Sequence, residues 1–177
     1  RYLVSRNEAT GLVTPGHIME LDLDSRPVDE NARSYQEVHI HAEIYKARPD
    51  VMAVCHHHAP AFMPLIITQT DYVPVFHLGA TGGSRPPFWD QRAEFGDTNL
   101  LVVKPEEGAS LAKALATHNM VLMVNHGVIA LPVGPASGTP RSMSTFPELL
   151  LRLRPPGRAS LDVRLRAWYN PDLASRN

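Results

Sequence analysis

The sequence has a single cysteine and no hydrophobic run long enough to cross a membrane. Because Cys55 is the only cysteine, a disulfide scaffold is excluded. Its place inside an apolar stretch fits a reducing compartment, which we expect to be the cytoplasm. A membrane-spanning helix needs roughly 20 apolar residues, and no signal-peptide pattern opens the chain. The net charge of −1 gives no electrostatic reason to expect binding to nucleic acid or to a membrane surface.

Lysine and histidine are missing from residues 131–177, which instead carry seven arginines and seven prolines. All nine histidines and all three lysines lie in residues 1–130. We therefore predict one domain over residues 1–130, followed by a divergent Arg/Pro-rich tail over 131–177 that is disordered or frame-shifted. The chain also begins without methionine, in a strand-like stretch, so we expect the N-terminus of the domain to be missing.

Hydrophobic periodicity and turn residues predict strands that alternate with helices, a pattern typical of an α/β fold. The expected strands span residues 2–5, 20–25, 51–58, 72–78, 99–103 and 120–124. Helices are expected over residues 35–47 and 107–117. The remaining stretches are a helix start or a turn at 12–18, a short helix or strand at 61–68, a loop at 79–83 and irregular chain at 86–95.

Three consecutive histidines, His56 to His58, end the apolar run 51–55. In a strand, His56 and His58 point to one face and His57 to the other. Such a pair can place two imidazoles on one metal ion. Isolated histidines are more often surface or core residues, so the pair alone leaves both interpretations open.

Glu37 and His126 complete a candidate site. Strand ends of an α/β sheet converge on one edge, and there three imidazoles leave an open coordination position on a bound metal. A carboxylate beside the metal can act as a general acid or base. Taken singly, His126 fits a turn histidine and Glu37 a solvated helix carboxylate, so only the combination indicates a metal site.

The run from Glu37 to Pro60 resembles the signature of the class II aldolase/adducin family. It contains E-x-x-x-H, then I-Y-K-A-R-P-D, then H-x-H, while Asn125-His126-Gly127 and Leu12-Val13-Thr14-Pro15 supply two further elements. The resemblance covers roughly residues 1–130. It implies an α/β fold, a three-layer α/β/α class II aldolase-like sheet flanked by helices, here expected to be incomplete at both ends.

The same resemblance implies a role for each residue of the candidate site. His56, His58 and His126 match metal-binding histidines, and Glu37 matches the acidic residue that transfers protons and can touch the metal. His41 would orient Glu37 or a ligand, and Asn125 would contact the site or the substrate. The ligand set suits Zn²⁺ or Mn²⁺, with Co²⁺ or Fe²⁺ also compatible.

Three segments, 75–80, 87–90 and 95–102, look more like the decarboxylase branch of the family than the aldolase branch. That branch implies a metal-dependent lyase that decarboxylates a hydroxylated aromatic or pyridine dicarboxylate through a metal-stabilised enolate. Glu37 would move the proton, with its pKa raised by burial. His77 would then be a substrate contact, or else a surface histidine.

Two alternatives stay open at this point. One is a sugar-phosphate aldolase of the fuculose- or ribulose-phosphate type, or an epimerase. The other is an inactive adducin-like interaction protein. For the enzymes, the resemblance implies a small-molecule substrate and a homotetramer.

Overall fold

The computed structural model describes residues 1–75, 77, 79–83 and 85–132, and contains two sheets. Strands β1 (Tyr2–Ser5) and β2 (Ile18–Leu21) form an antiparallel hairpin. The larger sheet has the order β3-β6-β5-β4, from β3 (Cys55–His57), β4 (Phe88–Trp89), β5 (Met120–Met123) and β6 (Gly127–Ala130). Its β4–β5 pair is parallel and its other pairs are antiparallel, so the sheet is mixed.

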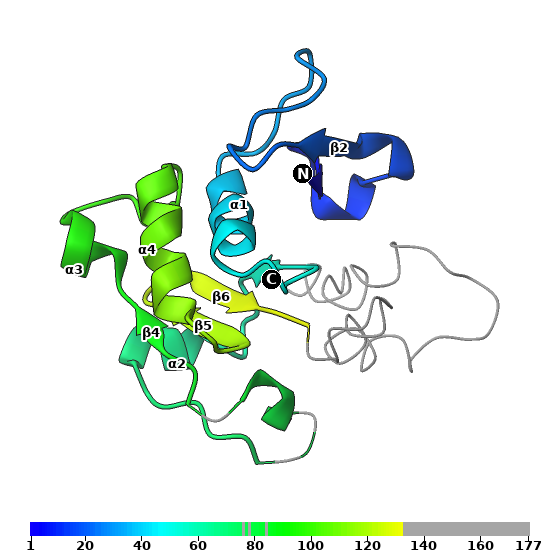
Figure 1. Ribbon diagram of the computed structural model, residues 1–177. Coiled ribbons are helices and arrows are strands. Elements are labelled where there is room, and N and C mark those ends of the chain that lie inside the picture. The colour runs from blue at the N-terminus through cyan, green and yellow to red at the C-terminus, as the bar shows by residue number, and fades with distance from the viewer. Residues whose placement is uncertain (76, 78, 84, 133–177) are drawn as a thin grey trace, which may run out of the picture.

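Helices cover both faces of the larger sheet (Figure 1). Helices α1 (Val38–Ala47) and α4 (Pro105–Leu115) lie on one face, where they pack against Val121 and Met123 of β5. On the other face, Ile66 of helix α2 (Met63–Thr68) packs against Met120 and Leu122. All four residues of β5 are therefore buried, as expected for a strand covered on both sides. The predicted α/β class, with a sheet between helices, is confirmed.

Helices α1 and α4 approach each other closely because Gly108 has no side chain. A Cβ at this position would lie 2.6 Å from the carbonyl oxygen of His39 on α1. Arg48, at the end of α1, donates to the carbonyl oxygen of Ala116 at the end of α4 (2.8 Å). It also forms two bonds to the Asp50 carboxylate. The R-P-D motif therefore joins the ends of both helices just before the chain enters β3.

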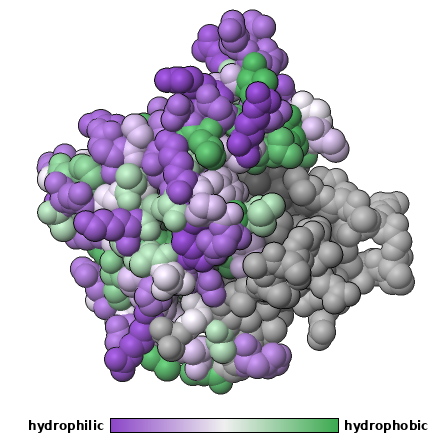
Figure 2. All heavy atoms as spheres, viewed as in Figure 1, coloured by the Kyte–Doolittle hydropathy of each residue, from purple (hydrophilic) through white to green (hydrophobic). Residues whose placement is uncertain are grey.

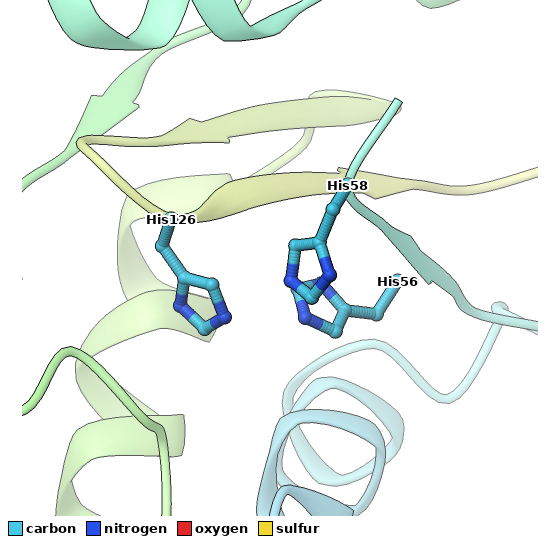
Figure 3. A group of neighbouring side chains, drawn as sticks. All are labelled: His56, His58 and His126. Atoms are coloured by element: carbon cyan, nitrogen blue, oxygen red, sulfur yellow. The ribbon is translucent and has the colours of Figure 1, made fainter. Parts of the chain in front are cut away.

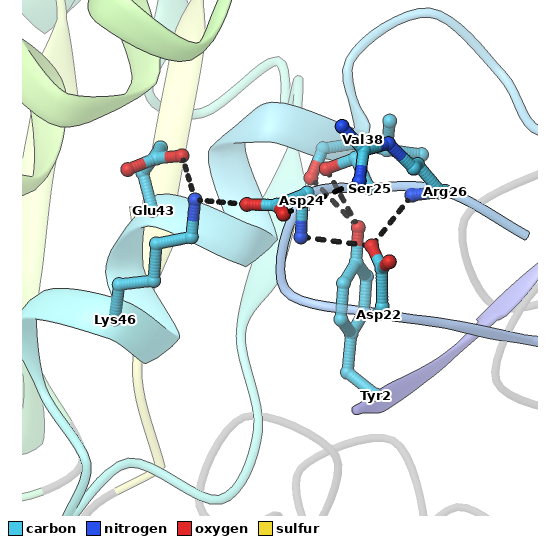
Figure 4. Close-up of polar contacts among 8 residues, drawn as sticks. All are labelled: Tyr2, Asp22, Asp24, Ser25, Arg26, Val38, Glu43 and Lys46. Atoms are coloured by element: carbon cyan, nitrogen blue, oxygen red, sulfur yellow. Dashed lines mark hydrogen bonds and ion pairs between the residues drawn. The ribbon is translucent and has the colours of Figure 1, made fainter.

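The start of α1 is anchored to the N-terminal hairpin (Figure 4). The Tyr2 hydroxyl donates to the carbonyl oxygen of Val38 (3.2 Å) and shares a hydrogen bond with Ser25 Oγ (3.1 Å). Further along the helix, Lys46 Nζ lies 3.2 Å from Asp24 Oδ1. These contacts connect the N-terminal hairpin and the loop after β2 to both ends of α1.

Most predicted elements exist, with shifted ends. The strands expected at 20–25, 51–58 and 120–124 are β2, β3 and β5, and the helices expected at 35–47 and 107–117 are α1 and α4. The 61–68 stretch forms the helix α2. Thr14 precedes a 3₁₀ turn at Pro15–His17, and further 3₁₀ turns lie at Thr10–Leu12 and Gly79–Gly82.

Two predicted strands are wrong. Residues 99–103 form no ladder, because side chains bond their peptide groups and Leu100 has a φ of 67°, outside the strand region. The described residues 72–75 also form no strand, although β-branched Val73 and Val75 favoured one.

Conversely, residues 86–95 are not irregular. They contain β4 and the short helix α3 (Gln91–Phe95), which Asp90 caps by accepting from the Arg92 N–H. A strand of two residues and a helix of five are each too short to show the period of their element.

Hydrophilic side chains predominate on the loop between β2 and α1, at the top of the view in Figure 2. Among the described residues, no helix has the length and apolar character needed to cross a bilayer. The Arg/Pro-rich tail that was predicted from residue 131 onward lies, from residue 133, outside the described residues.

Candidate metal centre

The antiparallel pairing of β3 with β6 brings the three predicted metal histidines to one edge of the sheet. His56 pairs with Ile129 and His57 with Val128, so the end of β3 lies beside the start of β6. His126 immediately precedes β6, in the turn that follows β5. One nitrogen from each of His56, His58 and His126 lies within 4.8 Å of the others, and the rings face a common centre (Figure 3).

The N-H-G motif has a conformational explanation. Asn125 adopts a φ of 57°, a left-handed conformation that asparagine tolerates better than most residues, and its N–H donates to the carbonyl oxygen of Ile66 on α2 (3.3 Å). Gly127 leaves room for the ligands: a Cβ there would lie 2.5 Å from His58 Cδ2 and 2.8 Å from His57 O. The structure thus gives Asn125 a backbone role, while its contact with substrate stays a prediction.

The imidazole nitrogens have the lone pairs that a metal requires. His56 Nδ1 lies 3.3 Å from the carbonyl oxygen of Val128, which can only accept, so Nδ1 carries a proton. In the neutral ring, Nε2 is then the nitrogen with the free lone pair. This Nε2 and both ring nitrogens of His126 are buried without a hydrogen-bond partner. Buried polar atoms are rarely left unpaired unless a ligand takes them. The donor set therefore fits a divalent transition metal.

Burial keeps His126 and His58 neutral. It lowers the pKa of His126 to about 4, and the nearby Glu37 carboxylate only partly opposes this shift. Burial and the neighbouring His56 ring also lower the pKa of His58, although that side chain is more exposed. Both imidazoles are therefore unprotonated at pH 7, the form that binds metal.

Glu37 lies at the N-terminal end of α1, beside the histidines, with only 14% of its side chain exposed. Its Oε1 is 3.4 Å from His126 Nε2 and its Oε2 is 3.7 Å from His56 Nε2. Oε1 also accepts a hydrogen bond from the Val102 N–H (3.1 Å). Glu37 is thus brought to the same centre as the three histidines.

The expectation that burial raises the pKa of Glu37 is wrong for the structure as it stands. Burial does act in that direction, but the His56 ring, the Val102 N–H and His126 together outweigh it, so the pKa of Glu37 lies below its ordinary value. Glu37 is therefore an anion at neutral pH, poised to accept a proton rather than to donate one.

Three further histidines have different surroundings. His41, one turn after Glu37, lies in an aromatic cluster, with its ring centroid 6.2 Å from that of Tyr35 and 6.4 Å from that of Tyr2. Burial lowers its pKa to about 4, so it is neutral, and its role in orienting Glu37 stays a prediction. His57 Nδ1 accepts from the Ala59 N–H (3.2 Å). His77 is exposed in a turn between α2 and β4, and its contact with substrate stays a prediction.

The sequence interpretation missed the part of the site that comes from backbone. The Val102 N–H is the hydrogen-bond donor to Glu37, and Val102 belongs to the segment that was expected to be a strand. Nothing in the sequence marks a peptide N–H as part of a site 65 residues away.

Residues 5–134 match the family described as the class II aldolase and adducin N-terminal domain. The chain is 31% identical over 121 residues to Decarboxylase NovR of Streptomyces niveus, covering 67% of this chain and 43% of that protein. It is 30% identical over 144 residues to Decarboxylase tropJ of Talaromyces stipitatus, covering 73% of this chain and 54% of that protein. The chain thus spans about half the length of these curated relatives.

Solved structures support the same fold. The L-fuculose-1-phosphate aldolase of Thermus thermophilus matches with a TM-score of 0.61 at 16% identity, over 99% of this chain and 80% of that one. YgbL of Escherichia coli, described as a putative aldolase/epimerase/decarboxylase, matches with a TM-score of 0.60 at 17% identity, over 93% and 80%. At these identities the likeness concerns the fold alone. Since the family match covers most of the chain and includes Glu37, the H-x-H pair and the N-H-G turn, this chain belongs to the class II aldolase and adducin N-terminal domain family.

Proposed function

We propose that this chain belongs to a divalent-metal-dependent carbon–carbon lyase that decarboxylates a hydroxylated aromatic or pyridine dicarboxylate. The observation that carries the proposal is the convergence of three imidazoles, with buried and unpartnered nitrogens among them, on the carboxylate of Glu37. The choice of decarboxylation is supported by the names of the relatives, two of which are decarboxylases at about 30% identity.

His56, His58 and His126 would hold the metal, for which Zn²⁺ or Mn²⁺ is the first candidate and Co²⁺ or Fe²⁺ is compatible. When bound, such a cation supplies the positive charge that stabilises the electron pair left on the substrate as the carbon–carbon bond breaks. The His56 Nδ1–H bond to the Val128 carbonyl holds the ring with Nε2 toward the centre.

Glu37 would carry the proton. Its Oε1 is held by the Val102 N–H, whereas Oε2 has no backbone donor among the described contacts. Because the lowered pKa keeps the carboxylate ionised, Oε2 can accept the proton of a substrate hydroxyl and later return a proton to the carbon that lost CO₂. His41 and Asn125 would hold the surrounding parts of the site, and His77 would contact the substrate.

The proposal is tested on the full chain in two steps. Elemental analysis should find about one divalent transition-metal ion per chain, and that ion should be lost in His56→Ala. Release of CO₂ from hydroxy-aryl dicarboxylates is then compared with release of aldehyde from sugar phosphates. Aldehyde release, or epimerisation, would identify the aldolase or epimerase alternative, and a chain without metal or turnover would identify an adducin-like interaction protein.

We further infer a cytoplasmic homotetramer and a domain that ends near residue 130, before a divergent tail. The support is the family resemblance for the oligomer, the single cysteine for the compartment and the change in composition for the tail. Size-exclusion chromatography with light scattering tests the oligomer, and sequencing of the coding DNA around codon 131 tests the tail.

A further inference from the structure

Gln91 is a buried polar residue outside the group formed by Glu37 and the three histidines. It begins helix α3 and is only 2% exposed. Its Nε2 donates to the carbonyl oxygen of Leu101 (3.1 Å), while its Oε1 is buried without a partner. A carbonyl oxygen can only accept, so the amide nitrogen must be the atom that faces Leu101. A buried amide with an unpaired oxygen is destabilising. Stability of the fold is therefore a weak explanation for a glutamine at this position.

One peptide group, between Leu101 and Val102, links Gln91 to Glu37 by two hydrogen bonds. The carbonyl of Leu101 and the N–H of Val102 belong to the same planar unit. Its oxygen accepts from Gln91 and its N–H donates to Glu37 Oε1 (3.1 Å). Because the unit is planar, a side chain that fixes the direction of the carbonyl also fixes the direction of the N–H. Hydrogen bonds connected in this way also polarise and strengthen one another.

The surrounding backbone does not hold this peptide by itself. Residues 99–103 have no strand partner, and Leu100 has a φ of 67°, which is unfavourable for a non-glycine residue. The neighbouring N–H groups of Leu100 and Leu101 are bonded by the side chains of Thr98 and Asn99. The orientation of the 101–102 peptide therefore depends on side chains, and Gln91 supplies the bond to its oxygen.

We propose that Gln91 is a positioning residue, which aims the Val102 N–H at Glu37 Oε1 and so fixes the orientation of the Glu37 carboxylate beside the three histidines. The inference rests on the proposed role of Glu37. Gln91 acts through the 101–102 peptide, because its hydrogen bond goes to the Leu101 carbonyl oxygen.

The first test needs neither metal nor substrate. In the ¹⁵N-labelled, metal-free chain, Gln91→Met keeps the length of the side chain and removes the donor. We expect the Val102 amide to exchange about tenfold faster, as one lost hydrogen bond predicts. Tyr72→Phe is the matched control, because it also removes a side-chain donor to a carbonyl, that of Gly79, far from Val102 in sequence. It should leave Val102 exchange unchanged. Unchanged exchange in Gln91→Met would overturn the proposal.

The second test uses Co²⁺ as a spectroscopic probe bound by the full chain. We expect Gln91→Met to shift the visible absorption of bound Co²⁺ in the same direction as Glu37→Gln, and to add nothing in the Glu37→Gln background. Equal shifts by Gln91→Met in both backgrounds would overturn the proposal. If Gln91→Met does not fold, Gln91→Leu, which also lacks a side-chain donor to Leu101, carries the same expectations.

Failure of the proposed function has a different signature. If the wild-type chain releases no CO₂ from any hydroxy-aryl dicarboxylate, the lyase assignment fails, whereas the exchange of Val102 still decides whether Gln91 orients the 101–102 peptide. If CO₂ is released and Val102 exchange does not respond to Gln91→Met, only the Gln91 proposal fails.

Discussion

Two largely buried carboxylates mark the starts of two neighbouring helices, and their partners differ. Glu107, in the first turn of α4 and 4% exposed, accepts through one oxygen from the N–H groups of Val103 (2.9 Å) and Lys104 (3.0 Å). These are unpaired donors of its own helix start, so the bonds cap the helix. Glu37, before α1, takes one N–H from Val102, which is 65 residues away, and faces two imidazoles.

The difference teaches that burial of an acid does not identify a site. Glu107 is satisfied by atoms three and four residues away, so its position serves the fold. Glu37 is surrounded by groups from distant parts of the chain, and the imidazole nitrogens beside it include buried ones without a hydrogen-bond partner. We therefore expect substitutions around Glu37 to affect metal binding and turnover, and substitutions of Glu107 to affect stability alone.

The largest effect should come from removing an imidazole beside Glu37. His56→Ala should weaken Zn²⁺ binding by more than about 100-fold, since even indirect partners of metal ligands contribute 10–100-fold. Turnover should be lost with the metal. Competition with a chromophoric chelator measures the affinity.

His57→Asn is the matched control for this substitution. An asparagine oxygen can still accept from the Ala59 N–H, and position 57 does not belong to the group of converging ligands. The control should keep the metal. Equal affinities of His56→Ala and wild type would remove the basis for the site.

Next, replacing each glutamate by glutamine should separate the role of Glu37 from that of Glu107. Glu37→Gln should lower kcat by about 10²–10⁴, the usual contribution of a general acid–base. Its free energy of unfolding should change little, because the amide oxygen can still accept from Val102. Steady-state kinetics and urea unfolding give both quantities.

Glu107→Gln should show the reverse behaviour. A neutral amide is a weaker acceptor for two N–H groups, so the free energy of unfolding should fall by about 1–2 kcal/mol, with kcat unchanged. The comparison breaks down if both variants lose turnover to the same extent, or if Glu37→Gln retains full activity with its metal bound.

A smaller effect is expected from Gly127→Ala. The new Cβ would lie 2.5 Å from His58 Cδ2 and 2.8 Å from His57 O, so the end of β3 must move away from His126. We expect metal affinity to fall about 10- to 100-fold, as for other changes that displace ligands indirectly. Isothermal titration with Zn²⁺ measures it. Gly11→Ala, where a Cβ would meet nothing within 4 Å, should bind as tightly as wild type.

The last prediction concerns pH and the metal-free chain. Burial lowers the folded-state pKa of His41, His57 and His126 from 6.5 to about 4. Between these values the unfolded chain binds more protons than the folded one, so the free energy of unfolding should fall as the pH drops from about 6.5 to about 4. Urea unfolding with a chelator at pH 7, 5.5 and 4.5 tests this.

His41→Phe serves as the control for the pH effect. It removes one titrating group from the aromatic cluster, so the dependence should become shallower than in wild type. A stability that is independent of pH over this range would contradict the burial of these histidines.

The sequence could predict those elements whose formation depends on residues close together in the chain. Helices α1 and α4 were predictable because their apolar faces repeat over ten and eleven residues and proline lies at one end of each. β4 and α3 were not, since two and five residues cannot show a period. The strand expected at 99–103 failed because Thr98, Asn99, Gln91 and Glu37 bond its peptide groups in place of a neighbouring strand.

By itself the sequence determined the residues of the candidate centre. Alternation along β3 places His56 and His58 together, and the E-x-x-x-H and N-H-G motifs connect Glu37 and His126 to the same family pattern. Only the tertiary structure decided the electrostatics and the backbone contribution. The direction in which the Glu37 pKa shifts follows from the balance between burial and the groups around the carboxylate. The 101–102 peptide between Gln91 and Glu37 comes from a segment with no sequence signature. Both depend on groups that are far apart in the chain, and their distances are fixed only when the sheet and its helices pack.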